Sequence, residues 1–491
     1  MIEDVVLIKI NKTYRDNMSP EELFKTTSKS WVASFQKTST RELKFYCPVY
    51  KNKIIEVYDF LGFHEELPQR KPSRYILEGK ISSTEMREKL VDLEVSKIHK
   101  GSGNPIKYTS LNKLLNLDGS EEHIEENPLI KDIYQDDLVT QIYNFIISKG
   151  FSYSLDSIKN LYLSIRSKPF VIISGISGTG KTKIVQLFAE SMGATEENSQ
   201  FKLIPVRPDW SDSAELLGFE DLKGDFQKGP LTKIIEHAQA NPDLPYFVLL
   251  DEMNLARVEY YFSDVLSVME SRRREGENII SSLLVDEKYI KGLRIPNNLY
   301  ILGTVNMDET THPFSKKVLD RANTIEFNDI ELNSFNFVES QEEVEKIRVS
   351  NELLEASFIS IKDIYSDHMQ LVVDVSALIS KINKHLKSIS AQVGYRVRDE
   401  ICFYMAHNAT SKLLEEDKGL DYCIMQKILP RILGSDDRVA DVLEKLYQEF
   451  VGIPYDDDNL QSSSKYPKST QKVIEMLERY RNDGFTSFWI S

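Results

Sequence analysis

Eight residues near the middle of the chain constrain its fold more than any other feature. Gly175–Thr182 read GISGTGKT and match the pattern G-x-x-x-x-G-K-[ST] in full. The apolar run Phe170–Ser174 precedes them and the helix-forming stretch Lys183–Met192 follows, so the order is strand, glycine-rich loop, helix. Such a loop curls its backbone N–H groups around phosphate at the positive end of a helix dipole. The pattern predicts a phosphate-binding loop.

The residue types in this loop predict binding of a nucleoside triphosphate with Mg²⁺. Lys181 should reach the β- and γ-phosphates, and the Thr182 hydroxyl should bind Mg²⁺. The remaining contacts should come from the rest of the loop, which consists of Gly175, Ser177, Gly178, Thr179 and Gly180 together with Ile176.

A second apolar run ends in two carboxylates. Tyr246–Leu250 is followed directly by Asp251 and Glu252. Ligands of an open parallel sheet bind at the carboxyl ends of its strands, so these side chains should lie beside the loop. We expect Asp251 to hold Mg²⁺ through water and Glu252 to act as the general base on the attacking water.

Two further polar residues are candidates for the same reaction. Asn306 ends the apolar run Tyr300–Val305 and could hydrogen-bond the γ-phosphate or the water, although an ordinary loop asparagine would give the same pattern. Arg321 could neutralise transition-state charge on the γ-phosphate of a neighbouring subunit. A surface salt bridge with Asp320 or Glu326 is the alternative.

The rest of the chain suggests several domains. Its 491 residues, 41% of them hydrophobic, are enough for about three. Buried strands alternating with helices predict an α/β domain over 136–328, a parallel sheet with helices on both faces. Residues 329–491 are mostly helix-periodic, residues 1–116 suggest a small mixed α+β domain, and 117–135 suggest an acidic linker.

Charge, cysteines and hydropathy narrow the class of protein. A net charge of −15 means that any contact with DNA or RNA must come from a local basic patch. The three cysteines form no C-x-x-C pair, which indicates free thiols rather than zinc or disulfides. No apolar run reaches the ~18 residues that span a bilayer, so we expect no membrane association and a cytoplasmic protein.

Several blocks of the sequence go beyond these generic patterns. They are Gly175–Thr182, Pro205–Trp210, Glu215–Gly218, Leu250–Tyr261, Val305–Thr310, Gly394–Arg396, Leu429–Gly434 and Phe485–Trp489. On these blocks the chain resembles the McrB family, the nucleotide-driven motor subunits of modification-dependent restriction systems. The resemblance covers roughly residues 150–491, and the segment after the two carboxylates is its most specific part.

This resemblance implies an AAA+ fold with a helical lid, a ring that is typically a hexamer, and a separate McrC-like nuclease subunit that cuts DNA. It implies that Asn306 is the first sensor, Arg321 the trans-acting finger, and Arg396 the second sensor, with Arg398 as an alternative. Family members read Asn-Thr-Ala-Asp-Arg after the sensor strand, whereas this chain reads Asn306-Met307-Asp308-Glu309-Thr310. ATP and GTP therefore both remain open.

Residues 1–116 resemble the PUA-like modules, such as EVE domains, that hold a flipped modified base. A flipped base needs aromatic faces for stacking and nearby cations for phosphates. Trp31, Tyr58 and Tyr75 could supply the faces, and Lys100 and Lys107 the cations. The alternative is that the aromatic residues belong to the core and the lysines to a solvated face.

The pattern of motifs predicts a motor rather than a nuclease. The sequence shows no metal-dependent nuclease centre, since Glu94-Val95-Ser96-Lys97 has one residue too many for an acidic-x-Lys site. We expect a Mg²⁺-dependent ATP or GTP hydrolase that drives DNA translocation and activates a separate nuclease. A MoxR-like chaperone that remodels proteins is the alternative, because it shares the AAA+ core.

Overall fold

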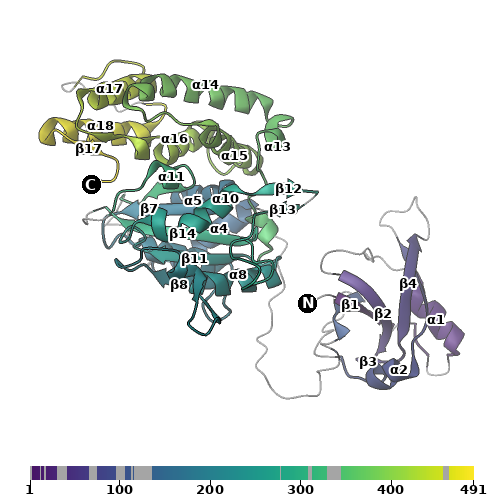
Figure 1. Cartoon of the computed structure of the whole chain (residues 1–491). Coiled ribbons are helices and arrows are strands. Elements are labelled where there is room, and N and C mark those ends of the chain that lie inside the picture. Colours follow the sequence, from purple (N-terminus) through teal and green to yellow (C-terminus); the bar gives the residue numbers. More distant parts are fainter. Residues whose placement is uncertain are drawn as a thin grey trace. The chain divides into compact units, whose positions relative to one another are not determined.

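The chain folds into two compact units, Met1–Asn127 and Pro128–Ser491 (Figure 1). The structure is a computed structural model, and each unit is described by itself. The predicted linker, 117–135, lies outside the described residues except for its last position. The described residues are 3–10, 13–15, 18–29, 41–65, 74–95, 106–111, 114, 135–276, 278–307, 312–328, 344–456 and 464–490.

The first unit is built on one six-stranded sheet in the order β5-β4-β2-β1-β6, with β3 paired to β2. β1 and β2 run parallel and the other pairs antiparallel. Among the described residues, two helices, α1 and α2, accompany it. The elements are β1 (Glu3–Lys9), α1 (Pro20–Ser28), β2 (Arg41–Tyr50), β3 (Lys53–Ile54), β4 (Tyr58–Glu65), β5 (Tyr75–Ile81), α2 (Thr84–Leu90) and β6 (Ile106–Thr109).

A tight turn connects β2 and β3. Lys51 and Asn52 have φ values of 45° and 65°, and the flanking residues Tyr50 and Lys53 pair across the turn. Positive φ at both central residues suits the twist of a two-residue hairpin.

The second unit contains a five-stranded, fully parallel sheet in the order β15-β7-β14-β11-β8. Three of these strands, β7, β11 and β14, match the predicted apolar runs. The edge strand β15 was not predicted, because it is short and mixes polar with apolar residues. The strands are β7 (Phe170–Gly175), β8 (Phe201–Pro205), β11 (Tyr246–Asp251), β14 (Leu299–Asn306) and β15 (Asn323–Glu326).

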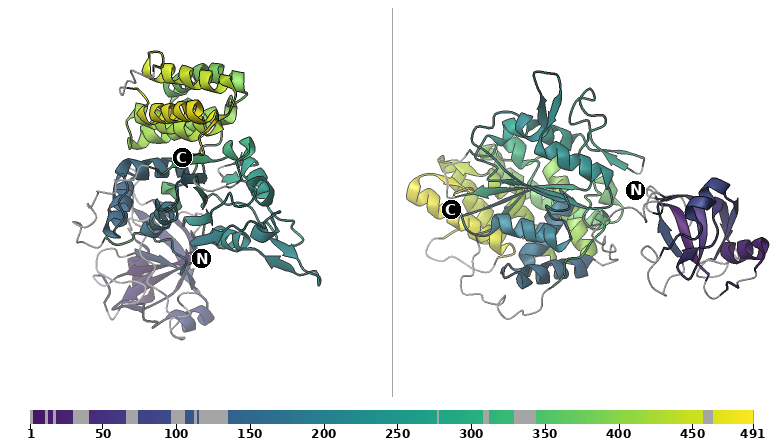
Figure 2. Two further views of the ribbon diagram at one scale, coloured as in Figure 1. Left: turned by 90° about the vertical axis from the view of Figure 1, so that its left-hand side faces the viewer. Right: turned by 90° about the horizontal axis from the view of Figure 1, so that it is seen from below.

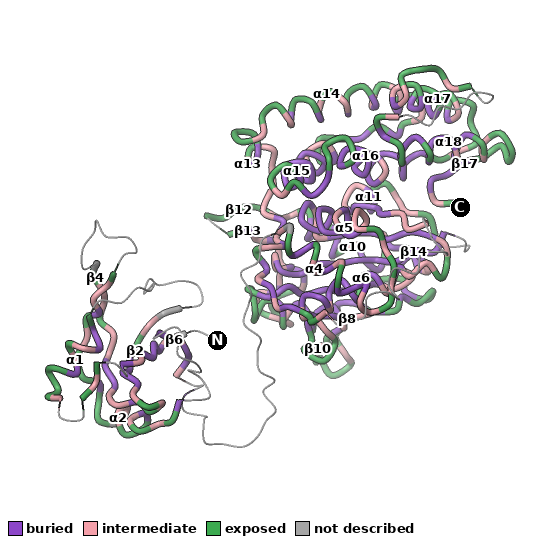
Figure 3. The backbone as a smooth tube through the Cα atoms, turned by 180° about the vertical axis from the view of Figure 1, so that it is seen from behind, coloured by how far each residue is buried: buried purple, intermediate pink, exposed green. Residues whose placement is uncertain are grey.

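Helices cover both faces of this sheet (Figure 2). Along β7, Val171 and Ile173 pack into one apolar cluster while Phe170 and Ile172 pack into another. This alternation buries both faces, and the strands are purple in the burial view (Figure 3). One face is covered by α4 (Gln135–Ser148), α5 (Leu155–Ser167) and α6 (Lys181–Ser191), the other by α7 (Ala214–Leu217), α8 (Pro230–Ala240) and α10 (Ser263–Glu270).

A helical region follows the sheet and shares its first apolar cluster (Figure 1). The periodicity predicted that this region is mostly helical, and the described residues agree. Two-residue strands β16 (Leu433–Gly434) and β17 (Thr486–Ser487) pair near its end. The helices are α13 (Lys362–Tyr365), α14 (Met369–Leu386), α15 (Tyr395–Ser411), α16 (Glu416–Lys427), α17 (Asp437–Val451) and α18 (Pro467–Asp483).

The cysteines agree with the expectation of free thiols. Cys47, Cys402 and Cys423 are buried free thiols, and burial raises the pKa of the Cys402 thiol to about 12. Within the described part of the chain, no helix is both long and apolar enough to cross a membrane.

Candidate functional site

The glycine-rich loop joins the end of β7 to the start of α6. Gly178 and Gly180 have φ values of 82° and 86°, in the left-handed region that favours glycine. A Cβ atom on Gly180 would also lie 2.4 Å from the Tyr153 hydroxyl oxygen, so this position has no space for a side chain. Because α6 begins at Lys181, the free N–H groups of its first turn point back toward the loop.

The Lys181 side chain folds over this loop. Its ammonium group donates to the carbonyl oxygens of Gly175 at 2.9 Å and Ile176 at 2.6 Å, and the residue is buried. Thr179 Oγ1 donates to the same Ile176 oxygen at 3.1 Å. Neutral carbonyls bind an ammonium group less strongly than anionic oxygens do. Phosphate oxygens can therefore replace these partners.

A hydrogen-bond network links the loop to the carboxyl ends of β11 and β14. Asp251 Oδ1 accepts from the hydroxyls of Thr182 at 2.8 Å and Thr304 at 2.7 Å. The Glu252 N–H donates to the Thr304 hydroxyl oxygen at 2.9 Å. Asn306 Nδ2 donates to Glu252 Oε1 at 3.1 Å. Residues expected to share one site from three separate motifs thus lie within hydrogen-bond reach.

The oxygen atoms in this network suit a magnesium ion. The Thr182 hydroxyl and the Asp251 carboxylate are 2.8 Å apart and half-buried. Mg²⁺ binds hard oxygen ligands and usually keeps several waters, so one hydroxyl and one carboxylate beside a phosphate loop are an appropriate donor set. These two residues would hold the ion.

Glu252 has an unusual backbone conformation. Its φ is 53°, in the left-handed region that costs a residue with a Cβ about 1–3 kcal/mol. The surroundings hold it there, because its N–H binds the Thr304 hydroxyl and the next N–H, of Met253, binds the Thr304 carbonyl at 2.9 Å. The turn directs the Glu252 carboxylate to Asn306.

Three residues that sequence reasoning did not select also hold this site. Thr304 lies two residues before Asn306 on one strand, and that alternation was the only available signal. Tyr153 donates its hydroxyl to Gly180 O at 2.9 Å, and burial raises the pKa of Tyr153 to about 12. Asn328 Oδ1 accepts from the Ile176 N–H at 3.0 Å. No pattern marked Tyr153 or Asn328, because their contacts are tertiary.

The two arginines with predicted roles meet at a carboxylate elsewhere in this unit. Arg321 pairs with Glu270 Oε1 at 2.5 Å, and Arg396, at the start of α15, pairs with the same oxygen. The Arg321 side chain is only 13% exposed. The alternative second sensor, Arg398, pairs with Asp399 at 2.5 Å. The surface salt bridges considered for Arg321, to Asp320 or Glu326, are therefore replaced by one to Glu270.

Comparison with known proteins adds a distant relative. The Type IV methyl-directed restriction enzyme EcoKMcrB subunit of Escherichia coli (strain K12) is 25% identical over 173 residues, which cover 33% of this chain. The match spans 38% of the length of that subunit. This chain is distantly similar to McrB. A family model described as a domain of unknown function (DUF8727) matches residues 338–485, within the helical region.

Two solved structures are also similar to parts of the chain. One is an inferred ATPase from Cytophaga hutchinsonii, with 18% identity and a TM-score of 0.38 over 60% of this chain and 85% of that one. The other is an Hsp104:casein complex from S. cerevisiae, with 19% identity and a TM-score of 0.29 over 41% of this chain and 37% of that one. The loop, the parallel sheet and its flanking helices together make the second unit a P-loop fold.

The candidate base-reading residues of the first unit differ in how far they are buried. Tyr58 is 1% exposed and stacks on Tyr46, with Phe24 against its edge. The expectation that Tyr58 offers a face to a base is therefore wrong in this structure, and the core alternative holds for it. Tyr75 and Lys107 are half-buried on β5 and β6. Trp31 and Lys100 lie outside the described residues.

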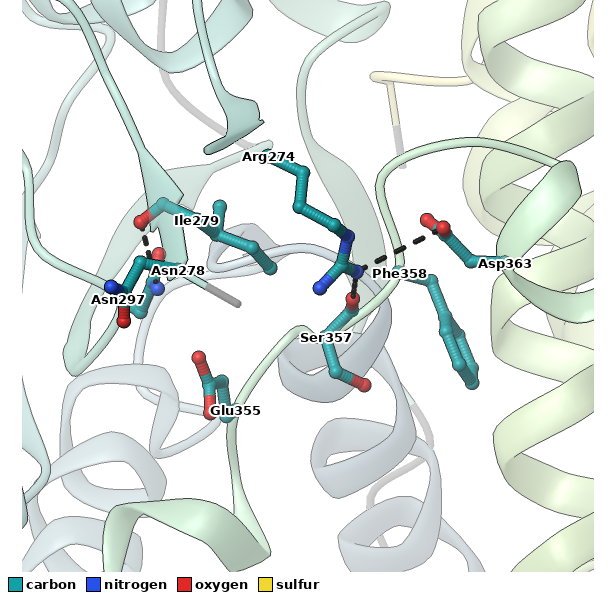
Figure 4. A pocket seen from close by; sticks show the side chains of 8 residues that line it. All are labelled: Arg274, Asn278, Ile279, Asn297, Glu355, Ser357, Phe358 and Asp363. Carbon is teal, nitrogen blue, oxygen red and sulfur yellow. Dashed lines mark hydrogen bonds and ion pairs between the residues drawn. The ribbon is translucent and has the colours of Figure 1, made fainter. Parts of the chain in front are cut away.

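The second unit also has a cavity of about 450 Å³ away from the phosphate loop (Figure 4). It lies between the hairpin of β12 (Arg273–Glu275) and β13 (Asn278–Ile280) and the segment that leads to α13. Arg274 reaches across it to Ser357 O at 3.0 Å and Asp363 at 3.8 Å. None of its lining residues belongs to the network around Asp251.

Proposed function

We propose that this chain is an AAA+ nucleoside triphosphatase that binds ATP or GTP with Mg²⁺ at Gly175–Thr182 and hydrolyses it. The observation that supports this most is the continuous network from Thr182 through Asp251 and Thr304 to Glu252 and Asn306. It joins a phosphate loop, a metal-binding pair and a base at one edge of the sheet. A purely structural glycine-rich turn would need none of these partners.

In the proposed reaction, each side chain of this network has one role. Lys181 exchanges the carbonyls of Gly175 and Ile176 for phosphate oxygens. Glu252 accepts a proton from the water that attacks the γ-phosphorus, and Asn306 keeps its carboxylate oriented. As the water bonds to the γ-phosphorus, the bond from that phosphorus to the β–γ bridging oxygen breaks, and the nucleoside diphosphate leaves. Mg²⁺, when bound by Thr182 and Asp251, would neutralise charge on the phosphates.

We further propose that the subunits act in a ring as the motor of a McrBC-like restriction system, with Arg321 as the trans-acting finger and Arg396 as a second sensor. The similarity to the EcoKMcrB subunit supports this role. Both arginines would then have to leave Glu270 when nucleotide and a neighbouring subunit are present. The partners would be a McrC-like nuclease subunit and DNA, which the first unit selects.

The test of the hydrolase is turnover of ATP and GTP with and without Mg²⁺. Glu252→Gln should abolish turnover, by about 10²–10⁴-fold, while nucleotide still binds, because only the base is lost. Glu190→Gln, the same chemical change on α6, is the matched control. Normal turnover in Glu252→Gln would contradict the assigned base, and a wild-type chain that binds no purine triphosphate would contradict the hydrolase.

The restriction role has its own test. Stimulation of turnover by duplex DNA, and DNA cleavage on addition of a McrC-like nuclease, are the expected results. Binding of DNA by residues 1–116 at low salt would support the reader. Stimulation by a protein substrate alone, with no response to modified or unmodified DNA, would favour a MoxR-like chaperone instead.

A further inference from the structure

A chain of hydrogen bonds runs from helix α18 to the phosphate loop. Lys472, on α18, binds Glu326 Oε1 at 2.6 Å. Asn328 Nδ2 donates to the same oxygen at 2.5 Å, and Asn328 Oδ1 accepts from the Ile176 N–H at 3.0 Å. Ile176 O in turn accepts from Lys181 Nζ at 2.6 Å. A side chain of the helical region is thus connected to the phosphate-binding lysine.

The charged end of this chain is buried. The side chains of Lys472 and Glu326 are 4% and 10% exposed, and the ammonium group lies 4.9 Å from the centre of the Phe488 ring. Glu475 is a second, more distant carboxylate, at 3.7 Å from Lys472. A buried charge needs its partner, since no water replaces it. Movement of α18 therefore acts directly on Glu326.

At the loop end of this hydrogen-bond chain, the backbone is held in place by close contacts. Phe327 N donates to Ser174 O at 2.7 Å, so the backbone beside Asn328 is fixed to β7. A Cβ atom on Gly175 would lie 2.5 Å from Phe327 O and 3.0 Å from Asn328 Oδ1. The segment 327–328 thus packs directly on the first residue of the loop.

We infer that Asn328 is a positioning residue that couples helix α18 to the phosphate loop. The inference rests on the nucleotide-binding function proposed above. The position needs an acceptor for the Ile176 N–H and a donor for the Glu326 carboxylate, and an amide supplies both. An aspartate would oppose Glu326 with like charge, and an alanine would leave the Ile176 N–H unpaired and Glu326 with Lys472 but without the amide donor. The coupling is reciprocal, so nucleotide binding in turn changes the protection of α18.

Hydrogen–deuterium exchange on the full, nucleotide-free chain tests the coupling. Asn328→Ala should speed exchange in the loop peptide about tenfold, the equivalent of one lost hydrogen bond. Lys472→Met should do the same, although Lys472 touches no loop atom in the chain of contacts described. Lys472→Arg should restore protection.

The matched control is Lys427→Met. Lys427 makes an equally buried ion pair with Glu400, with a side chain 2% exposed, and its Nζ binds Ala322 O rather than the loop. It should lower the melting temperature without faster loop exchange. Equal loop exchange in the Lys472→Met and Lys427→Met chains would overturn the inference. If Lys472→Met does not fold, Glu326→Gln/Lys472→Met removes both charges, and wild-type loop protection in that chain would overturn it.

Nucleotide affinity gives a second readout. Asn328→Ala should raise the Kd for ATP or GTP about tenfold, with a smaller change in kcat. The double variant Asn328→Ala/Lys472→Met should bind nucleotide with the same Kd as Asn328→Ala, because both changes break the same path of hydrogen bonds. A Kd raised by the product of the two single effects would contradict the coupling. If the wild-type chain binds no nucleotide, the proposed function fails, and the exchange experiment still decides the coupling.

Discussion

At the scale of single residues, one hydroxyl group organises the two carboxylates of the site. Thr304 Oγ1 donates to Asp251 and accepts from the Glu252 N–H, so its proton and one of its two lone pairs are committed. Asp251 is thereby held beside Thr182, and Glu252 is held in its left-handed backbone conformation. Loss of this hydroxyl would remove one contact of the Asp251 carboxylate and the side-chain contact of the Glu252 N–H.

We predict that Thr304→Val lowers kcat about 10–100-fold, the usual effect of removing a group that orients a ligand or base. Valine keeps the shape, so the fold should persist and the nucleotide Kd should change less than kcat. Thr324→Val is the control, because the buried Thr324 hydroxyl has no hydrogen-bond partner among the described residues. Steady-state kinetics should separate the two chains, and equal kcat values would contradict the role of Thr304.

The site was predictable from sequence where its residues are adjacent in a motif. Lys181 and Thr182 follow a glycine-rich loop, and Asp251 and Glu252 end an apolar strand, so local order placed them correctly beside one another. Thr304, Tyr153 and Asn328 escaped because each acts through a contact with a distant part of the chain. The meeting of Arg321 and Arg396 at Glu270 escaped for the same reason.

At the scale of elements, a buried ionic cluster holds the helical region on the sheet. Glu400, on α15, binds Lys168 at 2.5 Å and also pairs with Lys427, whose Nζ donates to Ala322 O at 2.7 Å. Burial raises the pKa of Glu400, but the two lysines more than offset this and hold the pKa below its usual range. The carboxylate stays charged between two cations that belong to α16 and to the end of α5.

We predict that Glu400→Gln destabilises the second unit by about 3–5 kcal/mol, because two buried or half-buried lysines lose their counter-charge. Urea unfolding measures this change. Glu416→Gln, an exposed position on α16, should stay within about 0.5 kcal/mol of wild type. Adding Lys427→Met to Glu400→Gln should recover part of the loss, and a Glu400→Gln chain as stable as wild type would contradict the charged cluster.

A second prediction at this scale concerns pH. His407, on α15, stacks on Phe358 with ring centres 4.4 Å apart, and burial together with the charge of Arg166 holds its pKa well below its ordinary value of 6.5. The unfolded chain binds a proton below pH 6.5 that the folded chain does not, so stability falls as pH falls.

His407→Phe should lose about 1.4 kcal/mol less stability than wild type between pH 7.5 and 5.5. Urea titrations at the two pH values measure the difference. His237→Gln, on the surface side of α8, should follow the wild-type dependence. An unchanged dependence in His407→Phe would show that this histidine is not the group that titrates.

The elements themselves were largely predictable, and the exceptions have physical causes. Strands buried on both faces give continuous apolar runs, which is why β7, β11 and β14 were found. β15 is an edge strand of four residues, and its three polar residues Asn323, Thr324 and Glu326 mask the pattern. The sequence could not decide whether Tyr58 is buried or exposed, since an aromatic residue on a strand gives the same pattern in a core and on a binding face.

At the scale of the whole molecule, the predicted trans-acting finger, Arg321, forms an ion pair within its own subunit, with Glu270. A trans-acting finger contributes only when a neighbour presents its γ-phosphate. Arg321 and Arg396 share the single Glu270 carboxylate in the isolated subunit, which compensates one of their two positive charges. Assembly would exchange this ion pair for contacts across a subunit boundary.

We predict that Arg321→Ala lowers turnover about 10³-fold, the effect of losing transition-state charge compensation from a finger. Mixing it with Lys181→Ala subunits should restore part of the turnover, because an intact finger then faces an intact loop. Arg438→Ala, which removes an exposed arginine paired with Asp436, is the control. Rings that form normally but show no rescue would contradict action in trans.

The left-handed turn at Glu252 also bears on how this protein can evolve. A glycine would relax the peptide there, yet it would remove the carboxylate that we propose as the general base. Selection for thermal stability and selection for turnover would therefore favour different residues at position 252. A library selected for thermal survival alone should accumulate glycine at this position and yield sturdy, inactive chains.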